Sequence, residues 1–76
     1  MAAKLSDLAP GQRARIIGIS GNGPTRRRMM DLGMVAGTAI SAIRTAPLAD
    51  PVEFEVRGYN LAIRRRDAAT VAIELL

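Results

Sequence analysis

Six residues in the second half of the chain alternate without error between apolar and charged side chains. In the segment 52–57 the apolar members are Val52, Phe54 and Val56. Successive side chains of a β-strand point to opposite faces, so this alternation predicts a strand with one buried and one solvated face. A similar alternation over residues 71–75 predicts a strand near the end of the sequence. The rest of the chain must therefore be arranged around a sheet.

The other elements are predicted from shorter patterns. Residues 12–19 read as a strand whose apolar phase changes, so a bulge is expected near Ile17 or Gly18. A proline opens the segment 24–32, which predicts a short helix, and Gly33 suits a left-handed cap after it. We also expect strands over 38–44 and 61–64, single helical turns over 5–8 and 65–69, loops over 20–23 and 47–51, and a tight turn at 58–60.

Five short strands and one inserted helix describe a small, strongly bent sheet. With 76 residues there is room for one core, so residues 1–76 are expected to form a single domain. A sheet of this size hides its edges best by curling, which favours a mainly β fold, a small SH3-like barrel with a short helix after the first strand. The predicted inner layer consists of Ile16, Ile40, Val52, Phe54, Val56, Leu61, Ile63, Val71 and Ile73.

The residue types that the sequence lacks limit the reactions and ligands that the chain could support. Cysteine and histidine are absent, which removes disulfides, thiol nucleophiles and the commonest general base and transition-metal ligand. No serine lies in a Gly-x-Ser-x-Gly motif, and no Gly-Lys-Ser/Thr follows the glycines of residues 18–23. We therefore expect no enzymatic activity, no cofactor and no built metal site.

The apolar runs are too short for a membrane protein. None exceeds three residues, whereas a span of the bilayer needs about 20. The first residues also lack the apolar stretch of a secretory signal. We expect a cytoplasmic protein that does not insert into the membrane.

Basic side chains outnumber acidic ones by 11 to 7, and most of the excess lies in two clusters. Arg26, Arg27 and Arg28 lie near the start of the predicted helix, where positive charge opposes the helix dipole. The cluster is either a solvated helix face or a docking surface for an anionic partner. The same two interpretations apply to Arg65 and Arg66, whereas a bracing role in the turn is expected of the neighbouring Arg64.

Apolar residues near these clusters complete a candidate docking surface. Methionine side chains adapt to irregular partners, which suits Met30 and Met34 to such a surface. Tyr59 lies on a predicted turn, and tyrosine is enriched among the residues that dominate interfaces. The predicted partner-binding residues are Arg26, Arg27, Arg28, Met30, Met34, Tyr59, Arg65 and Arg66.

Four motifs in order are similar to those of one known family. They read Leu5-x-Asp7-Leu8-x-x-Gly11, Arg28-Met29-x-x-Leu32-Gly33-Met34-x-x-Gly37, Ala46-Pro47-Leu48-x-Asp50-Pro51 and Gly58-x-x-Leu61-Ala62-Ile63-Arg64-x-x-x-Ala68. Over essentially the whole chain they resemble the ferrous-iron transport protein A (FeoA) family. The resemblance implies a cytoplasmic bacterial domain with an SH3-like fold. It also implies a role as a non-enzymatic accessory module that binds and regulates a membrane ferrous-iron transporter of the FeoB type, which carries its own GTPase domain.

Two other functions remain open from the residues themselves. A basic small barrel can bind nucleic acid, although only Phe54 and Tyr59 could serve as aromatic platforms. Direct binding of Fe²⁺ would have to use Asp, Glu or Met side chains. Asp50, Glu53 and Glu55 are the candidate carboxylates, but a solvated outer sheet face is the preferred interpretation of them. Met29, Met30 and Met34 could offer thioether ligands, but their spacing is explained more simply by packing. An exposed edge of the barrel would also allow self-association.

Overall fold

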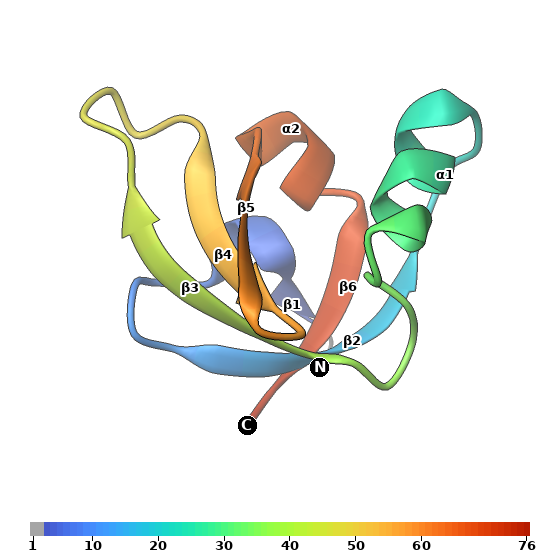
Figure 1. Cartoon of the computed structure of the whole chain (residues 1–76), viewed down its shortest axis with the longest axis horizontal. Helices are drawn as coiled ribbons and strands as arrows, with labels where there is room; N and C mark the ends of the chain where they lie inside the picture. The colour runs from blue at the N-terminus through green and yellow to red at the C-terminus, as the bar shows by residue number, and fades with distance from the viewer. Residues whose placement is uncertain (1–2) are drawn as a thin grey trace.

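The computed structural model describes residues 3–76 and contains one antiparallel sheet of six strands in the order β1-β6-β2-β3-β4-β5. In Figure 1 the sheet is strongly curved, and α2 and the β3–β4 loop lie at the end of the molecule away from the C-terminus. The elements follow the chain as β1 (Ala3–Lys4), the 3-10 turn η1 (Leu5–Asp7), β2 (Arg13–Ile19), α1 (Pro24–Asp31), β3 (Ala39–Thr45), β4 (Val52–Val56), β5 (Tyr59–Ile63), α2 (Arg65–Ala68) and β6 (Val71–Leu75).

The bulge predicted in the second strand is confirmed. The register between β2 and β6 shifts between Ile16 and Gly18, so that Ile16 is 1% exposed and Ile17 is 49% exposed. A second shift, between Ala42 and Arg44, interrupts the pairing of β3 with β4 and explains the mixed apolar phase of β3. Because a bulge bends its strand and increases the local twist, these two irregularities curve the sheet.

The hairpin between β4 and β5 is tighter than predicted. The turn was expected at residues 58–60, but it consists of Arg57 and Gly58, whose φ angles are 51° and 87°. A two-residue turn with positive φ at both positions matches the twist of the flanking strands. As a result Tyr59 and Asn60, predicted to lie in the turn, are the first residues of β5.

One strand was not predicted. The pair Ala3–Lys4 forms β1, and it lies beside β6 with Ala3 opposite Ile73. Two residues are too few for an alternation to be visible in the sequence. The sheet accordingly has six strands where about five were expected.

The predicted inner layer is buried, with Leu61 partly buried and packed against the core. Phe54 is fully buried among the aliphatic side chains around it. The prediction missed the small residues of the strands and the residues of turns and helices that close the core. These are Leu5, Leu8, Ala14, Met29, Met34, Ala42 and Ala68.

The hydrogen bonds at the end of α1 explain why Met34 is buried and not exposed as predicted. The Gly33 N–H donates to the Met30 carbonyl at 3.0 Å, and the Met34 N–H donates to the Met29 carbonyl at 3.1 Å, while Gly33 has a φ of 98°. This pair of bonds is a Schellman motif, in which the residue after the glycine packs back onto the last helical turn. Met34 is therefore fully buried, and its predicted place on an exposed docking surface is wrong.

The cap gives a test of stability. We expect Gly33→Ala to lower the free energy of unfolding by about 1–2 kcal/mol, because an L-residue is strained at this positive φ. An added Cβ would lie 2.9 Å from Arg57 Cδ, but that exposed side chain can move aside. Urea denaturation measures the change. Gly18→Ala is the control, since its φ is ordinary and nothing lies within 4 Å of an added Cβ. Equal losses in the two variants would contradict the role of the cap.

Candidate functional site

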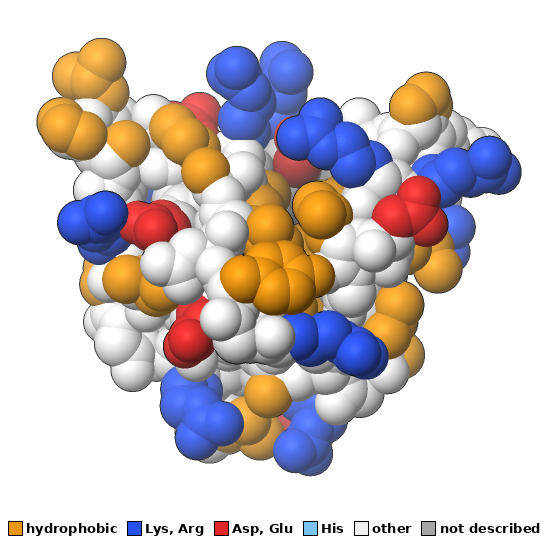
Figure 2. Space-filling view, viewed as in Figure 1, with side chains coloured by type: hydrophobic (Ala, Val, Ile, Leu, Met, Phe, Trp, Pro, Cys, Tyr) orange, Lys and Arg blue, Asp and Glu red, His pale blue; other side chains and the backbone are white. Residues whose placement is uncertain are grey.

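A groove of about 500 Å³ lies between α1, β5 and α2. We call it the α1–β5 groove. Its lining has an apolar part, which we call the floor, and a polar, mostly basic part, which we call the rim. The floor consists of Met29, Leu32, Leu61, Ala62 and Ile63, and the rim of Thr25, Arg28, Asn60, Arg64, Arg66 and Asp67. The two basic clusters of the sequence thus converge here, Arg28 from α1 and Arg66 from α2. In Figure 2 exposed apolar side chains lie at the centre of the face shown, with basic side chains above them and to their lower right.

The groove follows one edge of the sheet. Among residues 3–76, β5 pairs with β4 on one side and with no strand on the other. Residues of an antiparallel pair alternate between bonding their neighbour and pointing their backbone groups away. Since Tyr59 closes the two-residue turn, the groups that face the open edge are those of Asn60 and Ala62. Both residues also line the groove. The groove therefore offers backbone donors and acceptors beside an apolar floor.

The charge around the groove is mostly positive. Arg28, Arg64 and Arg66 line it together with a single carboxylate, that of Asp67. Within residues 3–76 these three arginine side chains form no hydrogen bond or ion pair, whereas Arg44 of β3 forms an ion pair with Glu53 of β4. Their guanidinium groups are thus available to carboxylates of a partner.

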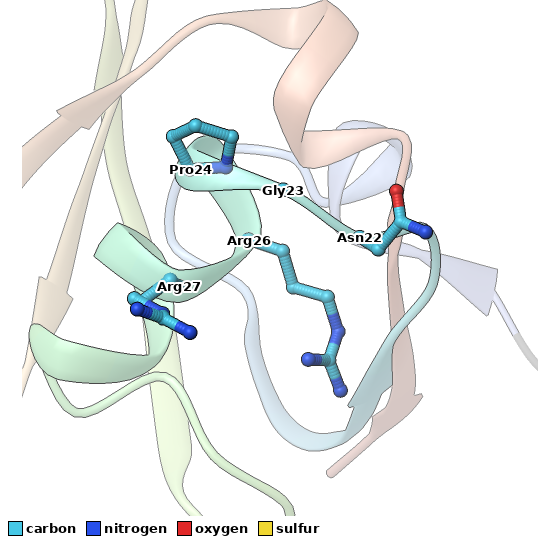
Figure 3. A pocket seen from close by; sticks show the side chains of 5 residues that line it. All are labelled: Asn22, Gly23, Pro24, Arg26 and Arg27. Atoms are coloured by element: carbon cyan, nitrogen blue, oxygen red, sulfur yellow. The ribbon is translucent and has the colours of Figure 1, made fainter.

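Only part of the first basic cluster lies at the α1–β5 groove. Arg26 is half-buried, and its Nε donates to the Ile19 carbonyl at 3.1 Å, which ties α1 to the end of β2. Arg27 is exposed and lines a separate hollow with Arg26, Asn22 and Pro24. Figure 3 shows the side chains of Arg26 and Arg27 diverging from the helix. Of the three arginines only Arg28 lines the α1–β5 groove.

Tyr59 connects the two walls of the groove. Its hydroxyl donates to the Leu32 carbonyl at 2.6 Å and so joins β5 to the end of α1. The side chain remains 45% exposed, which leaves the ring accessible to a partner. Met30 is 37% exposed but is not among the residues that line the groove.

In the second basic cluster it is Arg65, and not Arg64, whose side chain bonds the backbone, while Arg66 lines the groove. The Arg65 side chain, expected on a recognition surface, donates to the Ala49 carbonyl and at 3.4 Å to the Ser6 carbonyl. The Arg65 backbone N–H donates to Asp50 Oδ1 at 2.9 Å, which caps α2. Arg64, for which a bracing role was expected, is exposed and lines the groove.

Carboxylates do not gather into a metal site in the described part of the chain. No group of three or more Asp, Glu, His or Cys side chains within residues 3–76 could hold an ion. Glu53 accepts hydrogen bonds from Arg44 at 2.6 Å and from Asn60 at 3.1 Å. In the same residues no helix has the length and apolar character that crossing a membrane would require.

Comparison with known proteins identifies the family. The FeoA domain model matches residues 3–75. The chain belongs to the FeoA family. This FeoA domain is 40% identical over 73 residues to the Fe(2+) transport protein A/Fe(2+) transporter FeoB fusion protein of Porphyromonas gingivalis. The alignment covers 96% of the chain and only 9% of that relative's length.

Solved structures show the same fold. The FeoA protein of Chlorobium tepidum is 39% identical, with a TM-score of 0.91 over 97% of this FeoA domain and 70% of that chain. Zinc-complexed FeoA of Stenotrophomonas maltophilia, described as a prokaryotic SH3 domain protein, is 24% identical, with a TM-score of 0.84 over 95% of this chain and 89% of that one. At that identity the likeness concerns the fold alone, and it confirms the SH3-like fold that we predicted.

Because the Arg65 side chain forms hydrogen bonds and that of Arg66 forms none within the described residues, we expect substitutions at the two positions to differ in their effect on stability. We expect Arg65→Ala to lower the free energy of unfolding by about 1–2 kcal/mol, because two carbonyl contacts of a charged donor are lost. Arg66→Ala removes the same charge but no side-chain hydrogen bond or ion pair within the described residues, so its effect should stay within about 0.5 kcal/mol. Urea denaturation of both variants decides, and indistinguishable midpoints would contradict the bracing role of Arg65.

Proposed function

We propose that this FeoA domain is a non-enzymatic accessory module of ferrous-iron uptake. In this role it binds the cytoplasmic part of a FeoB-type membrane transporter and regulates it. The P. gingivalis relative supports the pairing, because there the two proteins are named as parts of one fusion. Covalent linkage keeps two modules at a high effective concentration, which benefits only modules that work together.

The observation that carries this function is the α1–β5 groove. Its floor, which includes Met29, Leu32 and Leu61, can bury apolar side chains of a partner, and its rim carries arginines. The backbone groups that face the open edge of β5 can bond an extended segment as an added strand. We therefore infer that the transporter supplies an extended segment in which apolar and acidic residues are combined.

The two parts of the groove have different effects on binding. Burial of apolar side chains on the floor supplies most of the affinity. The rim arginines Arg28 and Arg66 steer an acidic segment toward the groove and raise the association rate, an effect that weakens as the salt concentration rises. Binding in the groove holds the transporter's segment in one conformation. It therefore shifts the transporter toward the state in which the segment has that conformation.

The other predicted residues take graded roles in this proposal. Tyr59 lies at the Leu32 end of the groove and contacts the partner with its exposed ring. Arg27 and Met30 extend the surface beyond the groove. Arg26 and Arg65 act indirectly, because their hydrogen bonds hold α1 and α2 in position.

A charge-reversal experiment tests the groove. The domain with Arg28→Glu and Arg66→Glu should bind the soluble cytoplasmic part of the transporter from the same organism at least about tenfold more weakly than the unchanged domain at low salt. The control carries Arg13→Glu and Arg15→Glu, which make the same change of net charge on the exposed side of β2. We expect it to keep most of the affinity in isothermal titration calorimetry.

Three outcomes would count against this function. If the unchanged domain does not bind the transporter's cytoplasmic part, the proposed partner is wrong. If both double variants lose affinity equally, the attraction is general and the groove is not the docking site. If duplex or single-stranded oligonucleotides bind more tightly than the transporter, with a steep dependence on salt, the domain is a nucleic-acid-binding protein.

A further inference from the structure

The loop between β3 and β4 presents an apolar tip that the groove does not use. Leu48 is 90% exposed, which makes it the most exposed large apolar residue of residues 3–76. Its neighbours Pro47 and Ala49 are also exposed. The tip belongs to the motif Ala46-Pro47-Leu48-x-Asp50-Pro51, and no part of it lines the α1–β5 groove.

The loop is held firmly in spite of this exposure. The Ala46 N–H donates to the Pro51 carbonyl at 3.1 Å, and the Ala49 N–H donates to the Ala46 carbonyl at 2.7 Å. Arg65 adds its side-chain bond to the Ala49 carbonyl and its backbone bond to Asp50. Since these contacts close the loop on both sides of Leu48, the leucine side chain is presented to the solvent by a fixed backbone.

Basic residues lie beside the tip. Arg64, Arg65 and Arg66 belong to α2 or precede it, and Arg65 contacts the loop directly. The carboxylates nearby are those of Asp50, which accepts the bond from the Arg65 N–H, of Asp67, and of Glu53, which is paired with Arg44 beside the base of the loop. In Figures 1 and 2 the apolar loop and the basic side chains around α2 lie at the same end of the molecule, which we call the loop end.

We propose that the loop end binds the surface of a membrane that contains anionic lipids. Leu48 enters the boundary between headgroups and acyl chains, where an apolar side chain leaves water. Arg64 and Arg66 contact lipid phosphates, to which the planar guanidinium group donates two parallel hydrogen bonds. A protruding apolar residue beside cations suits an anionic membrane surface, where the leucine leaves water and the cations meet phosphates.

We expect the domain to bind the membrane weakly, with each of the three side chains adding its own contribution to the affinity. Each arginine near an anionic surface raises the affinity about fivefold, and burial of one leucine raises it about tenfold or more. Such affinity orients a domain that a second contact already holds near the membrane. The proposal does not depend on the transporter, because the loop end is complete in the isolated domain.

A single tryptophan reports the contact directly, since the sequence contains none. In Leu48→Trp we expect a blue shift of the emission, and quenching by brominated lipids, with vesicles that contain about 30% phosphatidylglycerol and not with phosphatidylcholine alone. Ala36→Trp is the control, because Ala36 is exposed in the turn between α1 and β3, away from the loop end. It should show no shift with either vesicle.

Co-sedimentation with the same vesicles measures the affinity of chains without tryptophan. Leu48→Asp should reduce binding at least about fivefold without lowering the denaturation midpoint, since the side chain is 90% exposed. Arg64→Ser with Arg66→Ser should reduce it at least as much, whereas Arg13→Ser with Arg15→Ser should retain most of it.

The lipid contact is overturned if the unchanged domain fails to bind anionic vesicles, or if Leu48→Asp binds them as well as the unchanged domain does. It is also overturned if Leu48→Asp loses binding to the transporter's soluble part while vesicles are bound by neither chain, because the tip is then a protein contact. Since the vesicles contain no protein, failure here leaves the groove experiment unaffected.

Discussion

The hydrogen bond from the Tyr59 hydroxyl to the Leu32 carbonyl joins the edge strand β5 to the end of α1. Without it the helix, which has only eight residues, would be held to the sheet through β2 and the core alone. Met34 anchors the chain after the helix in the core, and Arg26 fixes the helix to the end of β2. These contacts keep α1 beside the open sheet edge without covering it, and the α1–β5 groove is the space that results.

The arginines of the two clusters divide into two kinds by what their donors bond. Arg26 and Arg65 donate to backbone carbonyls and hold elements together. Arg28 and Arg66 form no such contact within residues 3–76 and lie at the rim of the groove. Sequence position does not separate the two kinds, since each cluster contains both. The difference arises from which carbonyls the fold brings within reach of a guanidinium group. For Arg26 this is the carbonyl of Ile19 at the end of β2, and for Arg65 these are the carbonyls of Ala49 and Ser6, which are distant in the chain.

The longer strands could be predicted from the sequence because their side chains alternate between the buried and the exposed face, and β4 is the clearest example. The sequence was also sufficient for the cap of α1, because few residues other than glycine adopt the φ of Gly33. It did not reveal β1, which is too short to show a pattern, nor the burial of Met34, which follows from the hydrogen bonds of the cap. The groove could not be predicted either, since α1, β5 and α2 meet only when the sheet curves.

The groove and the loop end depend on the same short helix. α2 has four residues, too few to be stable alone, and it is held by the Asp50 cap and the side-chain bonds of Arg65. The Ala46–Pro51 loop therefore supports the wall of the groove that carries Arg66. Any contact that displaces the loop acts on α2 through Arg65, and any partner that fills the groove meets a wall whose position the loop sets. This linkage gives a physical reason for the loop motif and the α2 motif to occur together in one small domain.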